Sequence, residues 1–242
     1  MREIRIYQPG VYQVGDLLEL SSDASHHVGV VLRMQPGEHL TLFCGDSREF
    51  HALIETVKKK QVTIRIDSVE EVNRESPLTI HLAQAISKGD RMELVMQKAV
   101  ELGVTKITPI LSEYCVVSLN HERMAKKMSQ WQAIAIAACE QSGRTIVPKI
   151  HPPLSFEDFV QDGHTGLQLV LDPRASKTWR EYNLPQEGVT VLVGPEGGFS
   201  DREIHDANSH GFQELSLGPR ILRTETAALT VISILQALGG DL

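Results

Sequence analysis

The chain has 242 residues, of which 41% are hydrophobic and 23% are charged, proportions ordinary for a globular protein of one or two domains. Its 24 basic and 31 acidic residues give a net charge of −7, which argues against a protein that coats nucleic acid non-specifically but leaves room for a local basic face. No apolar run is long enough to cross a bilayer, and the N-terminus lacks the apolar segment of a signal peptide. Three widely separated cysteines form no CxxC pair, and the ten histidines show no metal-binding spacing. We therefore expect a cytoplasmic protein without a membrane segment or a metal site.

Short strands are expected in residues 1–72. The segments 40–43 and 61–66 alternate between apolar and polar residues, and turn signals separate them. The segment "SDASHHVGVVLRM" (22–34) is the one expected helix, with Ser22 or Asp23 as its N-cap. Short strands at this spacing predict a small β-barrel, and the polar segment 70–77 is typical of a linker.

Strands then alternate with helices. The first predicted helix has Asp90 as its N-cap and stops at Gly103, and Ser200 with Glu203 forms the capping box of a later helix. Alternation of this kind predicts an α/β fold with a mostly parallel sheet that helices cover on both faces. The predicted strands are 78–86, 104–111, 145–150, 167–172, 189–194 and 212–217, and the other helices are 121–141 and 224–238.

A glycine-rich loop follows one of the late strands, in the stretch "VLVGPEGGFSDREI" (191–204). Three glycines within five positions indicate either a tight turn or a backbone that approaches a ligand closely. The loop does not match a P-loop, because no lysine follows Gly197 or Gly198. Nor does it have the GxGxxG spacing of dinucleotide-binding loops.

A second late loop, "LSLGPRILRTETAAL" (215–229), repeats the order of strand, Gly-Pro and helix. Several polar residues crowd its end, although a helix cap requires only one of them. Glu225 alone could be an acid that the dipole favours in the first helical turn. The polar residues are Arg220, Arg223, Thr224, Glu225 and Thr226.

Together the two loops resemble those of the knotted SPOUT-class RNA methyltransferases, and within that class the bacterial enzymes that methylate N3 of a uridine in small-subunit ribosomal RNA. The segments 84–113 and 140–144 support the resemblance, and residues 26–45 resemble the family's PUA-like barrel. The resemblance implies an N-terminal PUA-like β-barrel (1–72) that binds RNA. It also implies a C-terminal SPOUT α/β domain (73–242) with a deep trefoil knot, S-adenosylmethionine as cofactor, and a homodimer that acts on 16S ribosomal RNA or the small ribosomal subunit.

The resemblance also implies a site. Arg223, with Arg220 as the alternative, is expected to stabilise negative charge on the uracil. Glu225, with Glu196 as the alternative, is expected to accept the N3 proton. A structural salt bridge among these residues remains the alternative interpretation. The expected cofactor-binding residues are Leu171, Gly194, Glu196, Gly197, Gly198, Leu217, Gly218, Ile221, Leu222 and Thr226.

The expected target atom lies on the Watson–Crick edge of the base, so the uridine has to be unpaired or flipped out. Two further activities stay open, namely methylation of a ribose 2′-hydroxyl or of a guanine in transfer RNA, as does a non-catalytic RNA-binding protein. Basic side chains on the barrel and near the site are candidate RNA contacts. They are Arg2, Arg5, Lys58, Lys59, Lys60, Lys88, Arg91 and Arg144.

Overall fold

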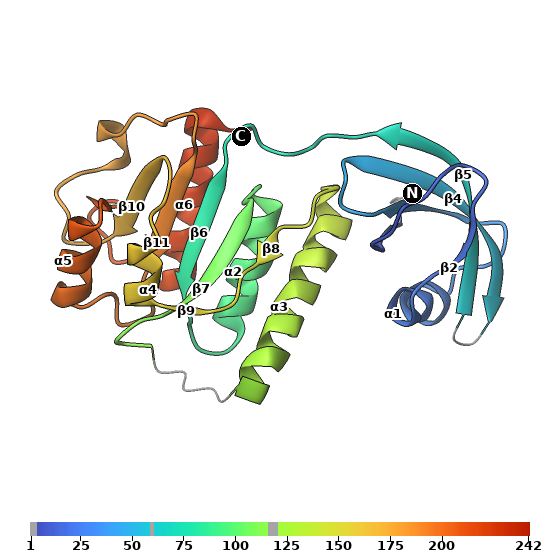
Figure 1. Cartoon of the computed structure of the whole chain (residues 1–242), viewed down its shortest axis with the longest axis horizontal. Coiled ribbons are helices and arrows are strands. Elements are labelled where there is room, and N and C mark those ends of the chain that lie inside the picture. The colour runs from blue at the N-terminus through green and yellow to red at the C-terminus, as the bar shows by residue number, and fades with distance from the viewer. Residues whose placement is uncertain (1–3, 59–60, 116–120) are drawn as a thin grey trace. The chain divides into compact units, whose positions relative to one another are not determined.

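The computed structural model describes residues 4–58, 61–115 and 121–242 (Figure 1). The chain divides into two compact units. The first consists of Met1–Glu75 and Cys139–Val147, and the second of Ser76–Ala138 and Pro148–Leu242. The first compact unit thus extends to Glu75 and also includes a nine-residue segment from the middle of the chain.

The first unit is a curved five-stranded sheet in the order β1-β3-β4-β5-β2; among its described strands the β1–β3 pair is parallel and the other three pairs are antiparallel. The edge strands β1 and β2 are joined by one side chain, because Gln8 donates to the Glu19 carbonyl and accepts from the Ser21 N–H. Val62, Ile64 and Ile66 point into one apolar core, as the alternation predicts. The strands are β1 (Arg5–Tyr7), β2 (Leu17–Glu19), β3 (His39–Phe43), β4 (Arg48–Lys58) and β5 (Gln61–Glu71).

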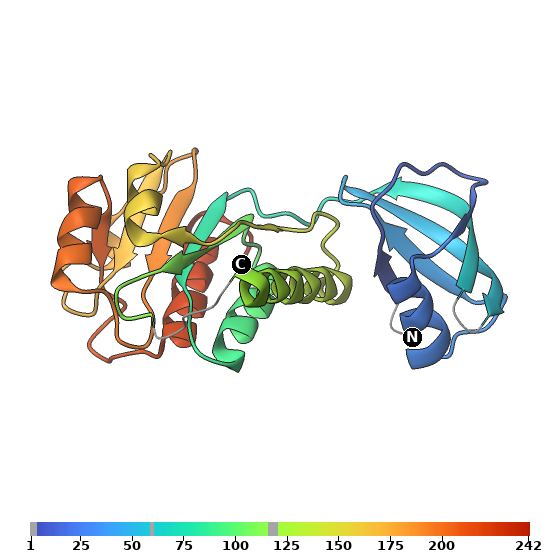
Figure 2. The same cartoon turned by 60° about the horizontal axis from the view of Figure 1, so that its bottom comes forward.

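The predicted N-terminal helix is present as α1 (Ser22–His26), continued by the wider turns of η1 (His27–Val31) (Figure 2). Its N-cap is Ser21, one residue before the predicted cap, because the Ser21 backbone is still extended and its hydroxyl accepts from the Ala24 N–H. Ala24 and Val28 belong to the same apolar core as the strands.

The second unit contains a seven-stranded sheet whose pairs are all parallel, which confirms the predicted α/β class. The strand order is β12-β10-β11-β6-β7-β8, and β9 also pairs with β7. The strands are β6 (Ile80–Ala85), β7 (Lys106–Leu111), β8 (Lys149–Ile150), β9 (Leu154–Ser155), β10 (Leu167–Leu171), β11 (Val189–Val193) and β12 (Gln213–Leu215).

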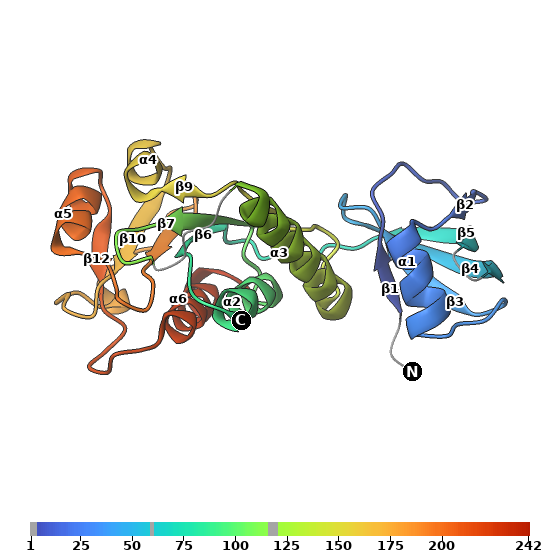
Figure 3. The ribbon, with the colours of Figure 1, turned by 90° about the horizontal axis from the view of Figure 1, so that it is seen from below.

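Helices cover both faces of this sheet, as predicted. In Figure 3, α2 and α6 lie on one face, and α4 and α5 lie on the other. The unpredicted α4 supplies Phe156 and Phe159 to an apolar core that also contains Leu192 of β11. The helical elements are α2 (Asp90–Glu101), α3 (His121–Ser142), α4 (Phe156–Gln161), η2 (Trp179–Glu181), α5 (Asp201–Ser209) and α6 (Thr224–Gly239).

For α2, the predicted N-cap is wrong and the predicted stop is correct. The N-cap is Gly89, not Asp90, because the backbone turns into the helix at Gly89 with φ +59°. The Glu93 carboxylate accepts from Lys127 and Gln130 of α3 instead of closing a capping box. Gly103, with φ +83°, follows the end of the helix as predicted.

In the described part of the chain, no helix is long and apolar enough to cross a membrane.

Candidate cofactor-binding and active site

A pocket of about 840 Å³ lies in the second unit at the carboxyl ends of β10, β11 and β12. The strands are neighbours in the sheet and parallel, so the loops that follow them gather at one edge. Ligands in open α/β sheets bind at this edge. The predicted glycine loop and the predicted second loop both line the pocket.

The three glycines of the first loop meet three different requirements. A Cβ at Gly194 would lie 3.1 Å from the carbonyl carbon of Gly198, so the loop itself leaves no room there. A Cβ at Gly197 would lie 3.1 Å from the Cβ of Tyr114. Gly198 has φ +72°, and a Cβ there would meet nothing within 4 Å. Turn geometry and packing inside the protein therefore account for the glycines, and of the three only Gly198 faces open space.

The end of this loop is fixed by a buried acid. Ser200 and Glu203 form the predicted capping box of α5, in which the Ser200 N–H donates to Glu203 Oε2 at 2.9 Å. The second carboxylate oxygen of Glu203, Oε1, accepts from the Glu113 N–H at 2.8 Å, just beyond β7. Glu203 therefore joins the glycine loop to the end of another strand.

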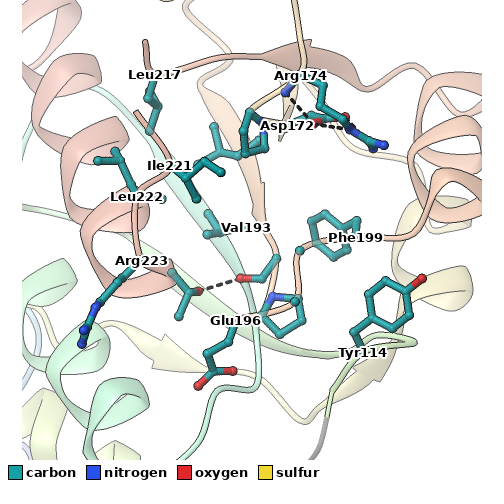
Figure 4. Close-up of a pocket in the computed structure, with 18 of the residues that line it drawn as sticks. Tyr114, Asp172, Arg174, Val193, Glu196, Phe199, Leu217, Ile221, Leu222 and Arg223 are labelled. Carbon is teal, nitrogen blue, oxygen red and sulfur yellow. Dashed lines mark hydrogen bonds and ion pairs between the residues drawn. The ribbon is translucent and has the colours of Figure 1, made fainter. Parts of the chain in front are cut away.

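The second loop forms an apolar wall of the pocket. Figure 4 shows Leu217, Ile221 and Leu222 along one side of the cavity. Ile221 is 87% exposed, so a ligand in the pocket would cover a large apolar side chain. The loop is joined to the glycine loop by Thr224, whose hydroxyl donates to the Gly194 carbonyl at 2.6 Å.

The loop after β10 supplies a third wall, of which only Leu171 was predicted from the sequence. Asp172 is buried and accepts hydrogen bonds from the backbone and the guanidinium of Arg174. Burial raises the pKa of Asp172, but the Arg174 hydrogen bonds outweigh it, so the pKa is lowered overall. Arg174 also pairs with Asp201 at the start of α5. These residues could have been found from their position directly after a predicted strand.

Glu196 is held as an anion at the other side of the pocket. Its Oε1 atom accepts from the Lys88 N–H at 3.0 Å and from the Arg91 guanidinium at 2.7 Å. Burial raises the pKa of Glu196, but hydrogen bonds from backbone N–H groups and from Arg91 lower it by more. A carboxylate with a lowered pKa is a weaker base, which argues against Glu196 as the proton acceptor.

Most of the predicted site residues line the pocket. Arg220 and Arg223 are at its rim with exposed side chains, and Figure 4 shows Arg223 extending away from the centre of the cavity. Glu225 and Thr226 are not among the lining residues, and Glu225 Oε2 is buried without a hydrogen-bond partner in the described structure. The predicted residues that line the pocket are Arg91, Leu171, Gly194, Glu196, Gly197, Gly198, Leu217, Gly218, Arg220, Ile221, Leu222 and Arg223.

The alternative interpretation, a salt bridge among these residues, is not seen. Within residues 4–58, 61–115 and 121–242, neither Arg220 nor Arg223 pairs with Glu225 or Glu196, and Glu196 pairs with Arg91 instead. About half of the lining residues were not predicted from the sequence. They are Tyr114, Asp172, Pro173, Arg174, Val193, Pro195, Phe199, Ser200, Asp201, Ile204, Leu215, Thr224 and Ala227.

Two of the predicted RNA contacts are wrong. Arg5 is 9% exposed and pairs with the buried Glu49, while Arg144 is 4% exposed and pairs with Glu75. Arg5 also donates to the Arg144 carbonyl at 3.0 Å, so both guanidiniums belong to a buried network of the first unit. A buried, paired guanidinium cannot reach a phosphate.

The other predicted RNA contacts differ in their surroundings. Lys58 and Lys88 are exposed, and Arg91 is half-buried against Glu196. Arg2, Lys59 and Lys60 lie outside the described residues. In the part of the chain that the structure covers, no group of three or more His, Cys, Asp or Glu residues could hold a metal ion.

Comparison with known families gives two matches that together span most of the chain. Residues 74–236 match the RNA methyltransferase domain, and residues 20–67 match the RNA methyltransferase PUA domain. The expectation of a PUA-like N-terminal unit followed by an RNA methyltransferase domain is therefore confirmed.

Individual proteins are similar over nearly the full length. The ribosomal RNA small subunit methyltransferase E of Buchnera aphidicola subsp. Schizaphis graminum is 38% identical over 239 residues, which cover 98% of this chain and 97% of that protein. The protein of the same name from Bacillus subtilis (strain 168) is 30% identical over 235 residues, 92% of each chain.

Two of the solved structures that are similar to this chain contain the cofactor. A methyltransferase of Legionella pneumophila in complex with S-adenosylmethionine is 61% identical, with a TM-score of 0.97 over 100% of both chains. A ribosomal RNA small subunit methyltransferase E of Neisseria gonorrhoeae bound to S-adenosylmethionine is 38% identical, with a TM-score of 0.94 over 100% of both chains.

Proposed function

This chain belongs to the family of ribosomal RNA small subunit methyltransferase E proteins, and on this premise we propose that it transfers the methyl group of S-adenosylmethionine to N3 of a specific uridine in 16S ribosomal RNA. The observation that carries the proposal is the pocket at the carboxyl ends of β10, β11 and β12. It lies in a chain that matches S-adenosylmethionine-bound structures along its whole length.

The pocket fits this cofactor in three respects. The exposed Ile221, with Leu217 and Leu222, offers an apolar wall for the adenine. Gly198 and Gly218 both have positive φ and open space where a Cβ would be, so a ligand can approach their backbone. The carboxylates of Asp172 and Glu196 each form an ion pair with an arginine of the protein, so neither requires a positively charged group of the ligand as its partner. When bound, the cofactor supplies a methyl group on a positively charged sulfur.

The chain's own residues would act on the target base. N3 of uracil carries a proton and is a poor nucleophile while neutral, so its negative charge has to be stabilised as the proton leaves. Arg223 and Arg220 both line the pocket with exposed side chains, and the planar donors of a guanidinium suit a uracil carbonyl. Of the two candidate bases, Glu196 lines the pocket, but backbone hydrogen bonds and Arg91 outweigh the effect of burial and lower its pKa, which makes it a weaker base. Glu225 stays the proposed base, although it is not among the residues that line the pocket in this structure.

We further propose that the C-terminal segment forms the trefoil knot. The strand β12 lies at the edge of the sheet beside β10, whereas α6 packs on β6 and β11. The connecting residues 216–223 and the first residue of α6 therefore pass the loops that follow β10 and β11, and together they contact both. The Ser216 N–H donates to the Lys177 carbonyl at 2.9 Å, and the Thr224 hydroxyl binds the Gly194 carbonyl.

The active form is proposed to be a cytoplasmic homodimer that pairs through α6. Leu229 and Ile234 on this helix remain half-buried and Leu238 is 46% exposed, which leaves an apolar face for a two-fold partner. Sedimentation at micromolar concentration should give twice the chain mass of 26.9 kDa. A species of 26.9 kDa would count against the dimer.

The exposed Lys58 and Lys88 and the rim arginines are the proposed RNA contacts.

A methyl group on N3 removes the Watson–Crick donor, so it stops reverse transcription, whereas a ribose 2′-O-methyl group leaves pairing intact. The test is single-turnover methylation of unmodified small subunits with S-adenosylmethionine, followed by primer extension along the 16S RNA. One cofactor-dependent stop at a uridine is expected. Methyl incorporation without such a stop would favour the ribose, and binding without incorporation would favour a non-catalytic protein.

A further inference from the structure

Tyr114 is an exposed aromatic residue at the pocket that the proposed mechanism does not use. It follows β7, lines the cavity and is 47% exposed. In Figure 4 it lies on the opposite side of the pocket from Leu217, Ile221 and Leu222. One edge of the side chain packs against Gly197, where any Cβ would lie 3.1 Å from Tyr114 Cβ.

The backbone on both sides of Tyr114 is held firmly. The Glu113 N–H donates to the buried Glu203 at 2.8 Å. The Cys115 N–H donates to the Ser112 carbonyl at 3.0 Å, and the Cys115 thiol donates to the Ile86 carbonyl at 3.1 Å. The exposure of the ring is therefore not a consequence of a loose loop. A large aromatic side chain is held in place beside the cavity with much of its surface uncovered.

The pocket also has room for more than one planar group. Its volume of about 840 Å³ is in the upper part of the range for small-molecule sites. The apolar wall at Leu217, Ile221 and Leu222 is suited to one planar ring, and Tyr114 offers a second surface across the cavity. Proteins that bind unpaired nucleotides commonly stack the exposed bases on aromatic side chains.

We propose that Tyr114 is the stacking platform for the target base, an inference that rests on the proposed function. Stacking supplies affinity and orientation but tolerates any base, because every base has a π-face. Tyr114 therefore holds the uracil in place, and hydrogen bonds from the rim arginines distinguish it from other bases. Glu203 acts indirectly, by fixing the backbone on which Tyr114 is presented.

The test compares Tyr114→Ala, Tyr114→Phe and Tyr114→Leu with the wild type. Two quantities are measured, namely kcat/KM for unmodified small subunits and the calorimetric Kd for S-adenosylmethionine. Tyr114→Ala should lower kcat/KM by about tenfold or more, while the cofactor Kd stays within about twofold. Phenylalanine should restore the rate and leucine should not, since only phenylalanine has an aromatic face. Leu111→Ala changes an exposed residue at the end of β7, the strand that precedes Tyr114, and Leu111 does not line the pocket; this variant is the matched control and should behave as wild type.

Each other outcome overturns a specific part of the reasoning. A wild-type kcat/KM for Tyr114→Ala, or equal rescue by leucine and phenylalanine, would refute stacking. A cofactor Kd that weakens in parallel with kcat/KM would mean that Tyr114 acts by supporting the glycine loop at Gly197. If the wild-type protein itself methylates no small-subunit RNA, the proposed function fails, and the Tyr114 proposal fails with it.

Discussion

Thr224 connects the two late loops of the pocket with the buried strand β6 through one hydroxyl group. Its Oγ1 atom donates to the Gly194 carbonyl at 2.6 Å and accepts from Gln84 Nε2 at 2.9 Å. Thr224 is 6% exposed and Gln84 is fully buried. Valine has nearly the same shape but no hydroxyl, so Thr224→Val would leave two polar groups without this partner. Each hydrogen bond contributes about 1 kcal/mol net, so the free energy of unfolding should fall by about 2 kcal/mol.

Urea-induced unfolding followed by tryptophan fluorescence measures this loss. The two tryptophans, Trp131 and Trp179, both lie in the second unit with Thr224, so the signal reports the relevant part of the chain. Thr226→Val is the matched control, because Thr226 is on the same helix but is exposed. Its stability should change by no more than about 0.5 kcal/mol.

The same pair of variants tests the cofactor site. Thr224→Val frees the Gly194 carbonyl and should weaken S-adenosylmethionine binding in calorimetric titration, whereas Thr226→Val should not, because Thr226 does not line the pocket. If both variants unfold at the same urea concentration, the Thr224 hydrogen bonds contribute no net stability and the reasoning is refuted. Weaker cofactor binding by Thr226→Val would restore the original prediction for that residue.

Three further predictions concern catalysis and pH. Arg223→Ala should lower the single-turnover rate ~10²–10³-fold and leave cofactor affinity within about twofold, with little rescue by lysine; a near wild-type rate would refute the charge role. Glu225→Gln should slow methylation most near neutral pH and less as the pH rises, because the substrate N3 then ionises unaided; a wild-type pH profile would make Glu225 a helix-terminal acid. Burial, with Lys106 and two histidines nearby, holds the pKa of His81 at about 3 rather than 6.5. As the pH falls, the unfolded chain therefore binds a proton at His81 before the folded chain does. The stability that depends on neutral His81 is complete above pH 6.5, and the free energy of unfolding falls towards pH 3 by up to ~1.4 kcal/mol per pH unit. His81→Gln should flatten urea stability between about pH 6 and about pH 4, and an unchanged slope would contradict this.

Local patterns predicted the regular elements well. The Ser200–Glu203 capping box, the stop at Gly103 and the buried face of α6 at Ala228, Ile232 and Leu235 are all as expected, because each depends on residues within a few positions. The two errors at the helix starts are also local, because each observed cap is a direct neighbour of the predicted one. Ser21 and Gly89 cap one residue earlier than predicted, since the cap depends on backbone angles that neighbouring polar residues do not determine.

Charges were harder to interpret, because their partners are distant in the sequence. Arg5 and Glu49 are 44 residues apart, and Arg5 and Arg144 are 139 apart. Sequence alone shows a positive charge in each case and cannot show that it is buried. The same limit applies to Glu196, whose partner Arg91 is 105 residues away and lowers its basicity.

The charged side chains of the pocket fall into two groups, and the division fits the proposed reaction. Inside, Glu196 pairs with Arg91, and Asp172 and Asp201 share Arg174, so three carboxylates face two guanidiniums and the cavity favours a cationic cofactor. At the rim, Arg220 and Arg223 are exposed, and in the described structure no carboxylate pairs with either of them. A polyanionic RNA would therefore meet unneutralised positive charge at the entrance, in a protein whose net charge is −7. The two rim arginines therefore offer the RNA an electrostatic contact at the proposed entrance for the target base.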